Sequence, residues 1–133
     1  MPILAVTLVA LGCSNSDGGI VAGPTAPSQA EQPFPDVVEA GVTSDGDRFT
    51  VTATVSSPYD TEDRYADAFR VLGPEEQVLG VRELTHPHPD EQPFTRSLRG
   101  LVIPEEVTSV TVQARDLENG WGGHTVTAGV PGR

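Results

Sequence analysis

The chain has 133 residues, enough for one ordinary domain with a leader and a linker but too short for two separate hydrophobic cores. The chain has nineteen acidic residues and only eight basic ones, all of them arginine, so its formal net charge is -11. A field of this sign repels nucleic acid and anionic lipid headgroups, which makes both poor candidates as partners. It suits cations or basic surfaces, or it serves solubility alone.

The N-terminal residues have the pattern of an export leader. Residues 2–12 carry no charge, are almost wholly apolar, and precede Cys13, the only cysteine in the chain. They are too few to span a bilayer but fit the hydrophobic region of a secretory signal. The run Val9-Ala10-Leu11-Gly12-Cys13 resembles the lipobox of bacterial lipoproteins, although no Lys or Arg precedes it.

That resemblance implies cleavage before Cys13 and a diacylglycerol on its thiol. The mature protein would then face outward from a bacterial cell envelope, with lipid as its only membrane contact. The alternative is a buried N-terminal strand with a free core cysteine. Residues 13–35 follow as Ser, Asn, Gly, Pro, Ala and Gln with little to bury, which predicts a flexible linker after the 1–12 signal peptide.

From Asp36 the pattern changes to the period of two that is typical of β-strands. In the first strand Val38, Ala40 and Val42 are predicted to face a core, and an Asp-Gly pair at 45–46 predicts a hairpin turn. Further strands are predicted at 49–55, 65–72, 77–84, 94–101, 108–115 and 124–130. A lone cysteine leaves no internal disulfide, so the domain must depend on its core.

Seven short strands at near-even spacing predict an all-β, antiparallel sandwich over residues 36–131. The run Leu98-Arg99-Gly100-Leu101 before a turn, followed by the alternating residues 110–116, resembles the fifth and sixth strands of immunoglobulin-like and fibronectin type III-like domains. The cysteine pair, the third-strand tryptophan (Phe69 takes that place) and the tyrosine corner of such domains are missing from the sequence.

If strand directions alternate, the loops 57–64, 85–93 and 116–123 all emerge at one end of this sandwich. The middle loop contains His86-Pro87-His88-Pro89 beside two acids. Loops on a rigid sandwich are the usual place for function. The predicted binding surface therefore gathers residues from all three loops and the start of the last strand: Tyr59, Asp60, Glu62, Asp63, His86, His88, Asp90, Glu91, Trp121 and His124.

Three functions are compatible with such a surface. The first is recognition of an envelope protein or a glycan by a monomer, with Trp121 as an anchor unless it merely closes the end of the sandwich. The second is zinc or copper(II) binding by His86, His88 and His124, in which case a metal would be the only cofactor. The third is structural: Phe94 plugs the core and Arg96 pairs with a nearby acid. No catalytic motif occurs, so a non-enzymatic protein is expected.

Overall fold

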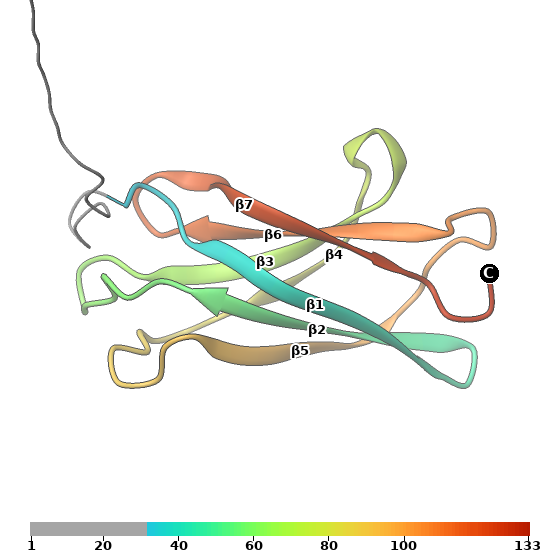
Figure 1. The fold of residues 1–133 in the computed structure, drawn as a ribbon, viewed down its shortest axis with the longest axis horizontal. Coiled ribbons are helices and arrows are strands. Elements are labelled where there is room, and N and C mark those ends of the chain that lie inside the picture. The colour runs from blue at the N-terminus through green and yellow to red at the C-terminus, as the bar shows by residue number, and fades with distance from the viewer. Residues whose placement is uncertain (1–31) are drawn as a thin grey trace, which may run out of the picture.

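Seven antiparallel strands make up the computed structural model, which describes residues 32–133 (Figure 1). The predicted signal peptide, Cys13 and most of the predicted linker lie outside these residues. The strands are β1 (Asp36–Asp45), β2 (Arg48–Ser56), β3 (Ala66–Leu72), β4 (Val78–Glu83), β5 (Phe94–Leu101), β6 (Ser109–Asp116) and β7 (Gly120–Gly129), with a 3-10 turn at Pro74–Glu76 between β3 and β4. Among the described residues, no helix is long and apolar enough to cross a membrane.

The strands form two layers that pack face to face. One sheet has the order β1-β2-β5, and the other has the order β4-β3-β6-β7. Every strand pair is antiparallel, and the two sheets enclose one hydrophobic core. The predicted seven-stranded, all-β sandwich is therefore confirmed at the level of two antiparallel layers.

Strict alternation of apolar and polar residues determines which face of a strand enters the core. In β2, Val51, Ala53 and Val55 are fully buried, whereas the intervening threonines point to the outer face. Val110, Val112 and Ala114 of β6 and Phe69 of β3 meet them from the other sheet. Because successive side chains of a strand point to opposite faces, these sequences can bury one apolar row only in this register.

The first strand departs from the predicted register. Its pairing with β2 shifts between Val37 and Glu39, so Val37 is fully buried and Val38 is 50% exposed. Ala40 and Val42 still pack against the core, as predicted. A bulge inserts one extra residue on one strand and exchanges the two faces beyond it, which is why the expectation for Val38 was wrong.

The last strand begins at Gly120, four residues earlier than predicted, and Trp121 therefore belongs to β7 and not to a loop. The turn between β6 and β7 is reduced to residues 117–119. The side chain of Asp116 makes this possible, since its Oδ2 accepts the backbone N–H groups of Glu118 and Asn119, each at 2.9 Å. An aspartate that bonds to the backbone a few residues ahead stabilises a tight turn.

Residues 32–35, which fall inside the predicted linker, pack against the domain. A Cβ at Gly122 would lie 2.6 Å from the ring of Phe34, and one at Gly123 would lie 2.0 Å from the carbonyl oxygen of Pro35. Gly123 also has a φ of +82°, which L side chains rarely adopt. The glycines of β7 therefore let the chain before β1 lie directly on that strand.

Candidate functional site

The loops 57–65, 84–93 and 117–119 lie together at one end of the sandwich, which we call the loop end (Figure 1). The 3-10 turn, the β1–β2 and β5–β6 connections and the C-terminus lie toward the opposite end. Residues 32–35 also reach the loop end, where the side-chain amide of Asn119 donates to the carbonyl oxygen of Pro33 at 2.8 Å. Segments far apart in the sequence thus share one small surface.

A buried carboxylate, Asp60, joins the first two loops. Its Oδ2 accepts the backbone N–H of His88 at 2.9 Å, and its Oδ1 accepts the N–H of Ala66 at 3.2 Å. Burial raises the pKa of Asp60, while these N–H donors and the Ser57 hydroxyl act in the opposite direction. The side chain is 4% exposed, so it braces the loops instead of presenting a charge to a partner.

Gln92 makes a second link between the same loops. Its Oε1 accepts the backbone N–H of Ser57 at 2.7 Å, and its Nε2 donates to the carbonyl oxygen of His88 at 2.9 Å. The adjacent Gln92–Pro93 peptide bond is cis. The loop 84–93 is therefore attached to the loop 57–65 through its backbone as well as its side chains.

A second buried carboxylate, Asp116, joins the first loop to the β6–β7 turn. Besides the turn N–H groups, it accepts the hydroxyl of Tyr59 at 2.6 Å and lies 3.1 Å from the guanidinium Nε of Arg64. That guanidinium also lies 3.9 Å from the centre of the Tyr59 ring. Burial, and then the hydrogen bond to Asp116, raise the pKa of the Tyr59 hydroxyl far above its usual range.

The side chain of His88 is buried through ring stacking, whereas those of Asp60 and Asp116 are buried among hydrogen-bond donors. Its ring stacks on Phe94, with centroids 4.1 Å apart and planes 16° from parallel. On the other hand, the ring of the exposed His86 is tilted relative to that of His88, and the centroids of these two rings are 4.7 Å apart. Within residues 32–133 neither ring nitrogen of His88 has a hydrogen-bond partner. Burial lowers the pKa of His88, with smaller contributions in the same direction from Arg96 and His86.

The histidines do not assemble the predicted metal site. His124 is exposed on β7, where its backbone N–H donates to Asp36 at 2.8 Å, and both ring nitrogens of His88 are shielded from solvent. No group of three or more His, Cys, Asp or Glu side chains in the described part of the chain is arranged to hold a metal ion. Nothing in the geometry therefore points to zinc or copper at this end.

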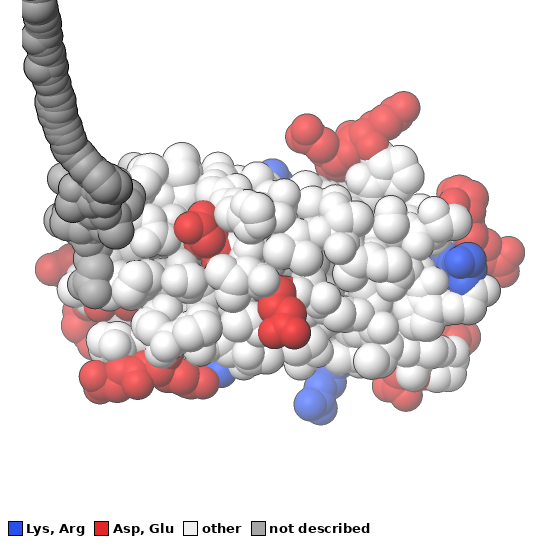
Figure 2. All heavy atoms as spheres, in the orientation of Figure 1, with Lys and Arg blue, Asp and Glu red and all other residues white. Residues whose placement is uncertain are grey.

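The predicted surface residues fall into two groups. Tyr59, Asp60 and His88 are buried, and they hold the loops in place. The exposed members at the loop end are Glu62, Asp63, His86, Asp90 and Glu91. Glu91 pairs with Arg96 at 3.1 Å, as the structural interpretation of this loop predicts. Figure 2 shows acidic side chains at both ends of the molecule and few basic ones between them.

Trp121 has a different position from the predicted one. It lies on β7 opposite Arg115 and is partly buried. The guanidinium carbons of Arg70 and Arg115 lie 4.2 and 5.1 Å from its ring centre, so cations already contact its π-system. Trp121 is therefore not a free anchor at the tip of a loop.

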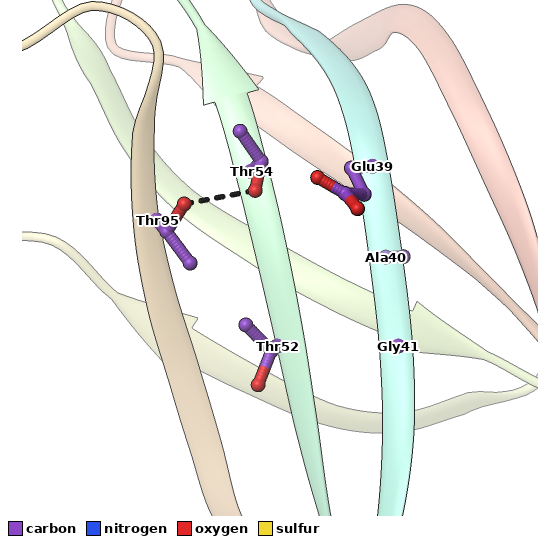
Figure 3. A pocket seen from close by; sticks show the side chains of 6 residues that line it. All are labelled: Glu39, Ala40, Gly41, Thr52, Thr54 and Thr95. Atoms are coloured by element: carbon purple, nitrogen blue, oxygen red, sulfur yellow. Dashed lines mark hydrogen bonds between the residues drawn. The ribbon is translucent and has the colours of Figure 1, made fainter.

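The sequence interpretation missed a hollow of about 270 Å³ on the outer face of the three-stranded sheet (Figure 3). Thr52, Thr54 and Thr95 line one side, and the hydroxyls of Thr54 and Thr95 are 2.8 Å apart. Glu39, Ala40 and Gly41 of β1 line the other side. The outward threonines were visible in the sequence, but their position opposite the small residues of β1 depends on strand pairing.

The class that the fold and loop end define is a two-layer, antiparallel β-sandwich with braced loops at one end. No protein-family model matches the chain. A protein of Halomicrobium mukohataei named "Putative lipoprotein" is 37% identical over 91 residues, which are 68% of this chain and 44% of that protein. The chain thus spans less than half the length of this relative.

A crystal structure of a DUF3823 family protein from Bacteroides ovatus superposes with a TM-score of 0.47 at 7% identity. The superposition covers 97% of this chain and 61% of that one.

Proposed function

We propose that the protein is a lipid-anchored, extracytoplasmic lipoprotein whose β-sandwich is a non-enzymatic interaction module. The name of the H. mukohataei relative supports the lipoprotein assignment, as does the lipobox-like run that ends at Cys13. The sheet orders β1-β2-β5 and β4-β3-β6-β7 support an immunoglobulin-like type, because the fourth strand joins the sheet of the third, sixth and seventh as an additional edge strand.

The observation that carries the interaction role is the bracing of the loop end. Asp60, Asp116 and Gln92 fix three loops to one another through buried hydrogen bonds. A surface held in one conformation before binding loses little entropy on association, and this preorganisation favours affinity. Loops that are held together by buried hydrogen bonds, with polar residues exposed above them, are therefore better suited to recognition than loops without such bonds.

Charge indicates the kind of partner that fits the loop end. Glu62, Asp63 and Asp90 are exposed there and take part in none of the ion pairs among the described residues. Acidic groups of this kind steer and orient a partner with a basic surface. We infer that the partner is a basic envelope protein, which the module contacts as a monomer.

The anchor is tested by replacing Cys13 with Ala in the full-length protein. The variant should lose both labelling by radioactive fatty acid and membrane association, because the thiol is the only site for the lipid. Unchanged labelling in the variant would contradict the anchor.

The interaction surface is tested with two variants that remove equal charge. One combines Glu62→Gln, Asp63→Asn and Asp90→Asn at the loop end. The control combines Glu75→Gln, Glu76→Gln and Glu105→Gln at the opposite end. Proteins captured from an envelope extract by the immobilised wild type should fall about tenfold with the loop-end variant and stay unchanged with the control. Equal loss with both variants would show that only net charge matters.

A further inference from the structure

The stacking contact between His88 and Phe94, which we call the His88–Phe94 contact, places a titratable ring where a purely apolar one would pack as well. His88 is 6% exposed, and its ring lies nearly parallel to that of Phe94, which is fully buried. Neither Nδ1 nor Nε2 bonds to any described residue. Buried polar atoms are normally paired, so an imidazole with two unpaired nitrogens needs an explanation.

The backbone of His88 also holds the loop 84–93 in place. Its N–H donates to Asp60, and its carbonyl oxygen accepts both the side-chain amide of Gln92 and the N–H of Glu91. Loss of the stacking on Phe94 would remove packing next to the bonds that attach this loop to the loop 57–65 and would weaken their hold on the loop. A change in the charge of one ring would be transmitted to the whole loop.

We propose that the His88–Phe94 contact is a pH-sensitive element that keeps the loop 84–93 closed against the loop end at neutral pH and releases it on acidification. This inference rests on the proposed function in one respect only, namely that the surface regulated in this way is the interaction surface.

The charged groups around the His88 ring have opposite effects on its protonation. Asp60 and Glu91 favour the imidazolium, whereas Arg96 and His86 disfavour it. Both acids are already engaged, since Asp60 accepts two backbone N–H groups and Glu91 pairs with Arg96. Burial is the largest influence, and it favours the neutral ring.

The direction of the pH effect follows from this balance. The pKa of His88 in the closed state lies below the value of about 6.5 for a solvated imidazole. As the pH falls below about 6.5, His88 takes up a proton in the open state before it does so in the closed state. The closed state therefore loses stability relative to the open state until the pH reaches the pKa of His88 in the closed state. The raised pKa of Asp60 acts the other way, because protonation of that carboxyl favours the closed state. The two contributions must therefore be separated by variants.

The experiment is an NMR titration of the full domain from about pH 7.5 to about pH 5. In the wild type, the backbone amide signals of residues 85–92 should change with the same midpoint as the His88 ring, and protection of the His88 N–H against hydrogen exchange should fall about tenfold. His88→Phe, which keeps the stacked ring, should abolish the change. His86→Phe, which removes the neighbouring exposed ring, should retain it.

Two results would overturn the inference: a ring of His88 that titrates at or above the solvated value, or loop amides that respond equally in His88→Phe. The wild-type ring and amide signals decide the matter even if that variant does not fold. Capture from envelope extract at both pH values separates this inference from the proposed function. If the wild type captures no protein at neutral pH, the proposed function alone is contradicted. If acid reduces capture by the wild type and by His88→Phe to the same extent, regulation by this contact is contradicted.

Discussion

Two buried carboxylates determine the local structure of the loop end at the scale of single residues. Asp60 and Asp116 are 4% and 1% exposed. Asp60 accepts the backbone N–H groups of His88 and Ala66, and Asp116 accepts the Tyr59 hydroxyl and the N–H of Glu118. An ionised group loses its hydration on burial and is tolerated only where donors replace the lost water. These aspartates therefore act through the donors they hold, and removing one leaves those donors unpaired.

Asp116→Asn should destabilise the domain by about 2–4 kcal/mol, because the guanidinium of Arg64 loses its only anionic partner among the described residues and the Tyr59 hydroxyl loses a charged acceptor. Urea denaturation at neutral pH measures the change. Glu83→Gln is the control: it removes the exposed acid of a surface ion pair with Arg115 and should cost under about 1 kcal/mol. Equal costs would contradict the role of Asp116.

The Tyr59 hydroxyl makes the domain sensitive to alkali. Its pKa in the folded state is raised, first by burial and then by Asp116. Above about pH 10 the unfolded chain therefore loses this proton while the folded chain keeps it, and stability falls as the pH rises. Tyr59→Phe should be less stable at neutral pH by about 1 kcal/mol but lose less stability at high pH. Urea midpoints between about pH 8 and 11 test this, and parallel pH curves for the two proteins would refute it.

At the scale of elements, the connection between β3 and β4 is the strained one. Glu75 and Glu76 have φ angles of 58° and 62°, and no other non-glycine residue in the described range has a positive φ. A side chain in the left-handed region costs about 1–2 kcal/mol relative to ordinary backbone. Asparagine and glycine adopt this conformation more readily, which is why they dominate tight hairpin turns.

Replacing Glu75 with Asn and Glu76 with Gly should therefore stabilise the domain by about 1 kcal/mol or more. The thermal midpoint, followed by circular dichroism, should rise. The matched control changes Glu105 to Asn and Glu106 to Gly, which removes equal charge near the same end where neither residue has a positive φ. A gain of similar size in the control would assign the effect to charge instead of backbone conformation.

At the scale of the whole molecule, the dominant feature is an excess of acids over arginines. The formal net charge of -11 belongs to a chain that has no lysine. Four ion pairs involve Arg64, Arg96 and Arg115 within residues 32–133, and most of the remaining acids are exposed. Like charges at this density repel one another and destabilise the compact state, and salt screens that repulsion.

The free energy of unfolding should thus increase as sodium chloride is raised from about 0.05 to about 1 M, a range over which the screening length falls to about 3 Å. Urea denaturation at each salt concentration measures the increase. The variant with Glu62→Gln, Asp63→Asn and Asp90→Asn carries less charge and should gain less from salt. A domain whose stability is independent of salt, or falls with it, would contradict this account.

The loop end was only partly predictable from the sequence. The directions of seven alternating strands predict that loops 57–64 and 85–93 share one end, and their residues do contact one another there. The assignment of Trp121 to a loop was wrong because Asp116 shortens the turn and extends β7. The burial of Tyr59 and His88 was not predicted either, since a polar loop in the sequence gives no sign of which members face inward.

Taken alone, the sequence determined the strand count and the inward rows of β2 and β6, because a period of two leaves one way to bury an apolar face. Only the tertiary structure decided the bulge at Val37, the packing of residues 32–35 on β7, and the pairing of Asp60 with the backbone of His88. Those features depend on contacts between residues far apart in the chain. Local sequence cannot determine such contacts, since their energies arise only once the two sheets have packed together.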